Sequence, residues 1–142
     1  MRSSPSRCGA QGSGFDGEAL RSRHFETRYE CPGDTYKRVT DRDLAPTLRF
    51  AERLASLAKP VWVRFTLVPG ETGDPANVEG IARFVAPMKN LEWVEVQPFH
   101  QMGSFKWKAM GLEYKFVHTQ PPGPDLVNRV IGQFRAAGCH VR

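Results

Sequence analysis

Cysteine is scarce in this sequence, and long apolar runs are absent. The three cysteines, Cys8, Cys31 and Cys139, are too few and too widely spaced for a disulfide framework or a self-contained metal site of the C-x-x-C type. Cysteine usage of this kind fits a reducing compartment. No apolar stretch has the length of a membrane span, and the N-terminus lacks the apolar segment of a signal peptide. We therefore expect a cytoplasmic protein with no membrane partner.

Acidic residues are the minority among the charged ones. Twenty Lys and Arg against 15 Asp and Glu give a formal net charge of +5. Such a balance can indicate nucleic-acid binding. The excess is diluted along the chain and much of it lies near the N-terminus, so a solvated surface explains it better. With 142 residues and 40% hydrophobic content, the chain can form one modest core.

Residues 1–33 differ in composition from the rest of the chain. They are rich in Ser, Gly and Arg and show no apolar period of 2 or 3.6 residues. A segment of this kind buries little surface, so we predict that it is poorly ordered. The regular part of the chain is then 34–142.

Apolar periodicity predicts alternating helices and strands after residue 33. Leu44, Leu48, Ala51 and Leu54 follow helical spacing, and Lys59-Pro60 ends that helix. The further elements expected are a strand over 61–68, a helix from Pro75 or Ala76 to about Pro87 with Asp74 as its cap, a strand over 91–96, a long loop over 97–124, a helix over 125–137 with Gly138 after it, and a short terminal strand over 139–141.

This order predicts an α/β fold with a parallel sheet of two or three strands. Such a sheet is too small to form a closed barrel, so the chain looks like part of a larger architecture. In βα folds the carboxyl ends of the strands carry the chemistry. Arg64, on the strand face opposite Val63 and Phe65, and His100, just after the second strand, are therefore the candidate site residues.

Several motifs carry a resemblance to a known family. They are TYKRVT (35–40), APTLRFAERLA (45–55), KPVWVRFTLVPG (59–70) and DPANVEGIARFVAPMKNLEWVEVQPFHQMGSFKWKAMGLEYKF (74–116), followed by a Pro-rich exit into a last helix. Together they resemble the C-terminal part of pyruvate formate-lyase-activating enzymes, over about residues 34–142. These are radical S-adenosylmethionine enzymes that install a glycyl radical.

The resemblance implies a fold, two cofactors and two partners. The fold is a partial (β/α) barrel, the C-terminal βα units of a radical SAM (β/α)6-type fold. The cofactors are S-adenosyl-L-methionine and a [4Fe-4S] cluster held by a C-x-x-x-C-x-x-C loop, and cleavage of the first gives the radical that removes hydrogen from a glycine. The partners are pyruvate formate-lyase, a glycyl radical enzyme, and a flavodoxin-type reductant. His100 matches the family histidine that contacts S-adenosylmethionine. Arg64 would lie inside the barrel, either against the cofactor or partner peptide or in a structural ion pair.

The chain also departs from the family pattern. No three cysteines have the cluster spacing, the glycine-rich segment for the methionine moiety is missing, and Thr27, Arg28 and Tyr29 stand where the family has Asp-x-Lys. Thiolate ligation is what binds and tunes such a cluster. We therefore assign no catalytic residue and no metal ligand, and expect a truncated or misframed form that is inactive by itself, with residues 1–33 foreign to the fold.

Two alternatives belong to other functional classes. One is a non-catalytic module that keeps only a partner-docking surface. The other is a small basic nucleic-acid-binding protein, built on the Arg-rich N-terminus and on Lys106, Trp107 and Lys108. For that cluster we expect packing of Trp107 within the loop and solvent exposure of the lysines, with Gly103 allowing a tight turn after His100.

Overall fold

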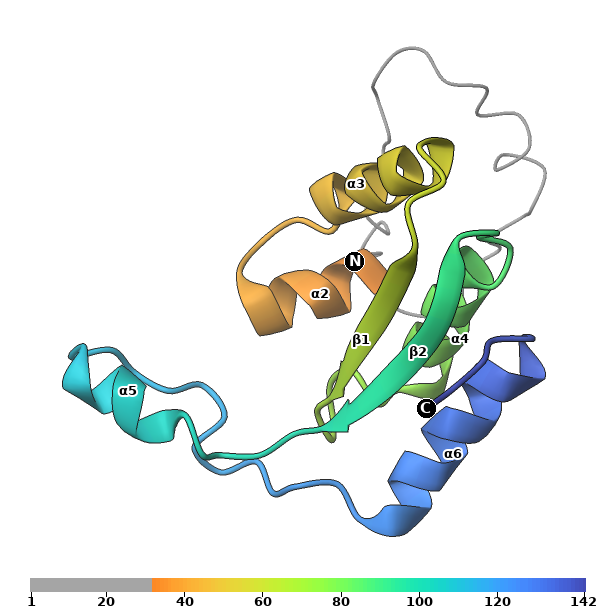
Figure 1. Cartoon of the computed structure of the whole chain (residues 1–142). Helices are drawn as coiled ribbons and strands as arrows, with labels where there is room; N and C mark the ends of the chain where they lie inside the picture. Colours follow the sequence, from red (N-terminus) through yellow and green to blue (C-terminus); the bar gives the residue numbers. More distant parts are fainter. Residues whose placement is uncertain (1–31) are drawn as a thin grey trace, which may run out of the picture.

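The computed structural model describes residues 32–142 (Figure 1). Its elements, in chain order, are α2 (Pro32–Thr40), α3 (Ala45–Ser56), β1 (Val61–Leu67), α4 (Pro75–Val85), β2 (Leu91–Pro98), α5 (Ser104–Ala109) and α6 (Pro124–Ala136). The helices and strands predicted between residues 44 and 137 are confirmed, with β2 two residues longer than expected. The prediction of a poorly ordered, foreign segment over 1–33 lies outside the described residues, apart from Pro32 and Gly33, which begin α2.

The sheet contains two parallel strands, joined through α4. Val63 lies opposite Val94 and Phe65 opposite Val96. The end of the chain runs along the other edge of β2, where Val94 N–H donates to His140 O (2.8 Å) and Arg142 N–H donates to Val94 O (3.0 Å). This parallel bridge between Val94 and Val141 is the predicted terminal strand in its shortest form. The predicted α/β class with a small parallel sheet is confirmed.

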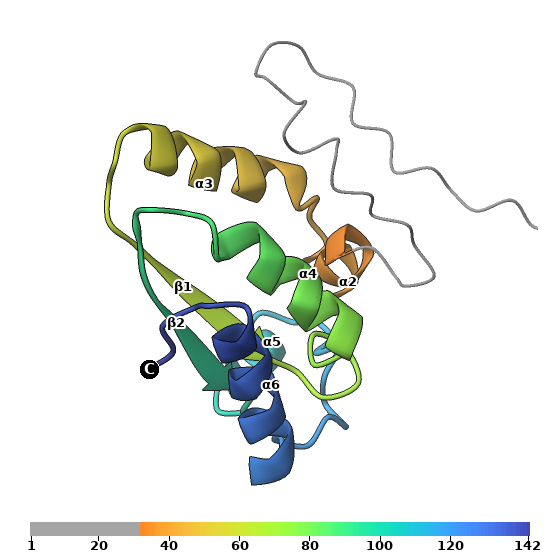
Figure 2. The same ribbon diagram turned by 90° about the vertical axis from the view of Figure 1, so that its right-hand side faces the viewer.

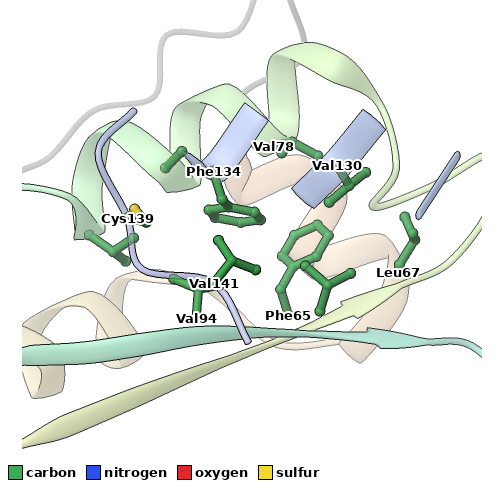
Figure 3. Close-up of a cluster of buried hydrophobic side chains, with 11 residues drawn as sticks. Phe65, Leu67, Val78, Val94, Val130, Phe134, Cys139 and Val141 are labelled. Atoms are coloured by element: carbon green, nitrogen blue, oxygen red, sulfur yellow. The ribbon is translucent and has the colours of Figure 1, made fainter. Parts of the chain in front are cut away.

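One face of the sheet is covered by helices. Both α4 and α6 lie on the same side of the strands (Figure 2). Between them and the sheet is the core shown in Figure 3, where Phe65 meets Phe134 edge-on with ring centroids 5.3 Å apart. Burying each such side chain contributes about 1.5–3 kcal/mol. The core residues are Phe65, Leu67, Val78, Ala82, Val85, Val94, Val96, Val130, Phe134, Cys139 and Val141.

A bulge near the start of the sheet decides which β2 side chains face the core. Val61 pairs with Leu91, but Trp62 pairs with Trp93, which leaves Glu92 as the extra residue. Strict alternation would put Leu91 and Trp93 on one face. Because of the bulge, Leu91 packs against the core, whereas Trp93 stacks on Trp62 on the opposite face.

Two helix-end predictions are confirmed. The Asp74 carboxylate accepts hydrogen bonds from the N–H groups of Ala76 (2.9 Å) and Asn77 (3.2 Å), with Pro75 in the first turn of α4. After α6, Gly138 adopts a φ of +92° and its N–H donates to Arg135 O (2.9 Å). Only glycine adopts this left-handed conformation easily, and it turns the chain back toward β2.

The structure corrects three expectations. The predicted loop over 97–124 contains a helix, α5, whose six residues are too few to show a helical period. Helix α2 was not expected because its sequence, PGDTYKRVT, has few apolar positions. Gly103 has a φ of −89°, which any residue adopts, and no atom lies within 4 Å of an added Cβ. The turn after His100 therefore does not depend on a glycine.

Candidate functional site

The face of the sheet opposite α4 and α6 carries mostly polar and aromatic side chains. We call this the open face. It consists of Trp62, Arg64 and Thr66 from β1 and Trp93, Glu95 and Gln97 from β2. The side chains of Trp62, Arg64 and Thr66 are exposed, and those from β2 are half-buried. The same strands therefore combine an apolar core on one side with a surface able to bind polar ligands on the other.

Arg64 is paired across the open face. Its Nε donates to Glu95 Oε2 at 3.0 Å, and the two residues lie opposite each other in register. The structure therefore shows the ion-pair alternative for Arg64, while its contact with a cofactor or partner peptide stays a prediction. An exposed pair of this kind contributes at most about 1 kcal/mol. A ligand carboxylate could accordingly replace Glu95 as the partner of the guanidinium at little cost.

An aromatic surface occupies the end of the open face where the strands begin. The rings of Trp62 and Trp93 stack with centroids 4.4 Å apart, and the Trp62 indole N–H donates to the Glu92 carboxylate. The Arg142 guanidinium lies 4.3 Å from the centroid of the Trp93 ring. Sequence reasoning placed Trp62 beside Arg64 but did not single out Trp93 or Glu95. The signal available was the alternation in WVEVQ after the bulge.

His100 lies just beyond β2. The preceding Phe99 is buried and its N–H donates to Leu67 O (3.0 Å), which continues the strand pairing by one residue. His100 itself is exposed, and its Nδ1 accepts a long hydrogen bond from Met102 N–H (3.4 Å). Its Nε2 has no partner among residues 32–142, so this nitrogen can contact a ligand. The role of His100 in binding stays a prediction.

Arg64 and His100 are not in contact, because Arg64 lies in the middle of β1 and His100 lies beyond the end of β2. Arg64 lies opposite Glu95, which precedes His100 by five residues. At the rise of a β-strand, this separates Arg64 and His100 by roughly 16 Å along the strand direction. The predicted common site therefore requires an elongated ligand, or separate contacts made by two ligands.

The loop after β1 is fixed by side-chain hydrogen bonds. Thr72 Oγ1 accepts from Val68 N–H and donates to Thr66 O, both at 2.7 Å. The buried Asn77 donates from Nδ2 to Thr72 O at 2.8 Å. The Arg129 guanidinium also donates to Gly73 O, which ties the loop to α6. The carboxyl end of β1 is thus a preorganised edge of the open face.

The described residues do not fit an iron–sulfur cluster. Within residues 32–142 no group of three or more His, Cys, Asp or Glu side chains could hold a metal ion. Cys139 lies in the core on the covered side, where burial raises the pKa of its thiol and so disfavours the thiolate that a metal requires. Over the same range, no helix combines the length and apolarity needed to cross a membrane.

Parallel strands joined by a helix, with a helical layer on one side and a polar face on the other, define a βα fold of the kind found in open and partial barrels. A domain of a pyruvate-formate lyase-activating enzyme from Bacteroides vulgatus shares this fold, with a TM-score of 0.62 over 78% of this chain and 59% of that one, at 18% identity. No family model matches the chain.

Sequence comparison points to the same proteins. The chain is 37% identical over 98 residues to a pyruvate formate-lyase-activating enzyme of Streptococcus mutans, and 40% identical over 86 residues to the pyruvate formate-lyase 1-activating enzyme of Escherichia coli K12. These matches cover 69% and 61% of this chain, but 37% and 35% of the relatives. The resemblance is confirmed, and the chain spans little more than a third of the curated relatives it matches.

Proposed function

We propose that this chain supplies one wall of an S-adenosylmethionine site in a protein system that activates pyruvate formate-lyase. The observation that carries the proposal is the open face, a polar and aromatic surface on two parallel strands, with the exposed His100 just beyond the end of β2. The names of the relatives support the choice of pyruvate formate-lyase as the partner.

The residues of the chain would bind and orient the ligand. The Arg64 guanidinium can exchange Glu95 for a carboxylate, and the carboxylate released can receive an ammonium group. Because His100 Nδ1 accepts a hydrogen bond from Met102 N–H, Nε2 carries the ring proton and can donate a hydrogen bond to the ligand. When bound, S-adenosylmethionine supplies a radical precursor in the enzymes that this chain resembles.

The [4Fe-4S] cluster belongs elsewhere in this proposal. The described residues do not fit it, and the three cysteines of the chain lack the C-x-x-x-C-x-x-C spacing. The chain alone is therefore proposed to be inactive, and a flavodoxin-type reductant would act on a separate cluster-bearing part.

Binding of S-adenosylmethionine to the purified chain tests the proposal. Equilibrium dialysis with the radiolabelled compound should show saturable binding that His100→Ala and Arg64→Ala each weaken by roughly 2- to 10-fold, which is what one hydrogen bond is worth. His118→Ala, which removes another exposed histidine, is the control and should bind normally. Equal binding by all four proteins would contradict the proposed site.

Anaerobic reconstitution with iron and sulfide tests the second half of the proposal. We expect no stoichiometric cluster and no 5'-deoxyadenosine. A stoichiometric cluster with turnover would show that Cys8, Cys31 and Cys139 form a site, and would remove the claim that the chain is inactive.

A non-catalytic docking module is the second candidate function. A specific observation favours it: the chain between β2 and α6 exposes a concentration of large apolar side chains.

A further inference from the structure

Most of the exposed large apolar side chains of the described structure lie in one segment, residues 102–117, which we call the apolar arm. The arm includes α5 and projects from the end of β2, away from the helical layer (Figure 1). Outside it, the exposed large apolar residues are Phe50, Leu57 and Trp62. The exposed large apolar residues of the arm are Met102, Phe105, Trp107, Met110, Leu112 and Val117. An exposed patch of this kind marks an interaction site more often than an accident of folding.

The arm is held in place at its base by polar contacts. The side-chain amide of Gln101 donates to the carbonyl oxygens of Phe116 (3.1 Å), Val117 (2.9 Å) and Thr119 (2.8 Å), which closes the ends of the arm on each other. Lys115 Nζ donates to Asp41 Oδ1 (2.6 Å) and to a backbone carbonyl of α2 (3.2 Å). Polar contacts therefore fix the base of the arm and leave its exposed apolar side chains available to a partner.

A row of aromatic rings stiffens the arm from inside. The buried Phe99 meets Phe116 at 5.9 Å, Phe116 meets Tyr114 at 6.2 Å, and Tyr114 meets Trp107 at 5.8 Å between ring centroids. The predicted packing of Trp107 within the loop is thereby confirmed. Each aromatic pair adds about 0.5–1.5 kcal/mol beyond the area it buries. A preformed surface loses little conformational entropy when a partner binds.

The charges on the arm indicate the chemistry of its partner. Lys106 and Lys108 are exposed beside Phe105 and Trp107, and neither has a carboxylate partner within residues 32–142; Lys106 Nζ lies 6.0 Å from the centroid of the Phe105 ring. Apolar side chains interleaved with unpaired ammonium groups are complementary to an apolar segment flanked by carboxylates. A second copy of this chain, with its own net charge of +5 and the same basic arm, fits less well.

We propose that the apolar arm is a preformed docking surface for a partner polypeptide with apolar side chains flanked by Asp or Glu. The proposal rests on the proposed function, because it takes pyruvate formate-lyase as that partner. It assigns docking to the arm and S-adenosylmethionine to the open face, so the two sites can be tested apart.

Biolayer interferometry between the full chain and purified Escherichia coli pyruvate formate-lyase tests the apolar part of the surface. Phe105→Ser with Met110→Ser should raise the Kd at least about tenfold, as expected for central apolar anchors. Phe50→Ser with Leu57→Ser is the matched control. Phe50 on α3 is 64% exposed and Phe105 66%, so both variants remove similar exposed groups without touching the core.

A charge reversal tests the basic part. Lys106→Glu with Lys108→Glu should weaken binding to the lyase, and the loss should shrink as salt is raised. Lys59→Glu with Lys89→Glu changes the net charge by the same amount at exposed positions outside the arm and should leave the Kd near that of the wild type.

Four results would overturn the docking proposal. They are failure of the wild-type chain to bind the lyase, equal binding by the arm variants and their controls, self-association of the wild type that the arm variants abolish, and single-stranded RNA binding that Lys106→Glu with Lys108→Glu abolishes while lyase binding persists. Saturable binding of S-adenosylmethionine in the dialysis experiment would leave the proposed S-adenosylmethionine site standing in each case. Its absence with normal lyase binding would overturn only the open-face site.

Discussion

The side chains of β1 and β2 alternate between two faces of the sheet, and these faces differ in burial, polarity and charge. On the covered face, Leu67 and Val94 are fully buried beneath α4 and α6. On the open face, Arg64 and Glu95 form an ion pair at the level where Val63 and Val94 pack into the covered side. Alternation along a strand is what allows one short sheet to carry stability on one side and ligand-binding chemistry on the other.

This difference predicts that substitutions on the covered face affect stability and that substitutions on the open face affect ligand binding. Apolar contacts on the covered face are numerous and shielded from water, so each loss leaves a cavity. Contacts on the open face are few, polar and partly hydrated, so their contribution to the free energy of unfolding is small. We expect the two faces to separate cleanly in measurements of stability and of ligand affinity.

Phe134→Ala should have the largest effect. Phe134 has no exposed surface and packs edge-on against Phe65, so truncation should lower the free energy of unfolding by about 3–5 kcal/mol. Urea denaturation followed by circular dichroism measures this loss. Thr66→Ala on the open face is the comparison and should change stability by less than about 0.5 kcal/mol. Similar losses for the two variants would show that the faces do not divide their roles as described.

Gly138→Ala should have the next largest effect. At a φ of +92° a Cβ costs about 1–2 kcal/mol, and strain there would disturb the segment that brings Cys139 and Val141 into the core. Gly103→Ala is the matched control, because Gly103 has a negative φ and open space around an added Cβ. It should be neutral or slightly stabilising in the same urea experiment. A destabilised Gly103→Ala variant would contradict the geometry of the turn after His100.

Removal of the open-face ion pair should have a smaller effect. A double-mutant cycle of Arg64→Ala and Glu95→Ala should give a coupling of about 0.2–1 kcal/mol that falls as salt is added, because both side chains are partly hydrated. Thermal unfolding at low and at high salt measures it. A coupling well above this range that persists at high salt would make the pair a structural element and weaken its role as a ligand site.

Replacement of the buried thiol should change how stability depends on pH in the alkaline range, in addition to the cost of the cavity it leaves at any pH. Burial raises the pKa of Cys139, so the folded protein favours the neutral thiol. Its contribution to stability is complete below the pKa of the unfolded chain and is lost as the pH rises through the raised folded pKa. Urea unfolding at neutral pH and at about pH 10 should show a larger alkaline loss for the wild type than for Cys139→Ala. If the wild type and Cys139→Ala lost equal stability at alkaline pH, the thiol would be in contact with water and the stated burial would be contradicted.

Strong local signals made most of the fold predictable. The helical spacing of Val78, Ile81, Ala82 and Val85, with Asp74 and Pro75 before them, predicts α4 within two residues of its observed end. Strict alternation in Val61–Leu67 likewise predicts which β1 side chains form the core. In both cases the apolar period agrees with the observed burial, and for α4 the cap residues agree with it as well.

The bulge and the partners of the site residues could not be predicted in the same way. The extra residue Glu92 reverses the faces of β2, and a single-residue shift of this kind depends on pairing with β1. The contact between Arg64 and Glu95 follows from that register. Helix α5 is too short for periodicity, and Gln101, which closes the apolar arm through three carbonyl oxygens, leaves no local pattern.

The central claim is that the open face, and not the covered face, binds S-adenosylmethionine. Nuclear magnetic resonance on the labelled chain tests it directly. The indole N–H groups of Trp62 and Trp93 and the Arg64 Nε–H report on the open face, and the His100 ring reports on the segment after β2. The methyl groups of Leu67 and Val94 report on the covered face. We predict that titration with S-adenosylmethionine shifts the Arg64 and His100 signals and leaves the methyl signals in place. Shifts confined to the covered face, or no shifts in a folded chain at millimolar ligand, would contradict the claim.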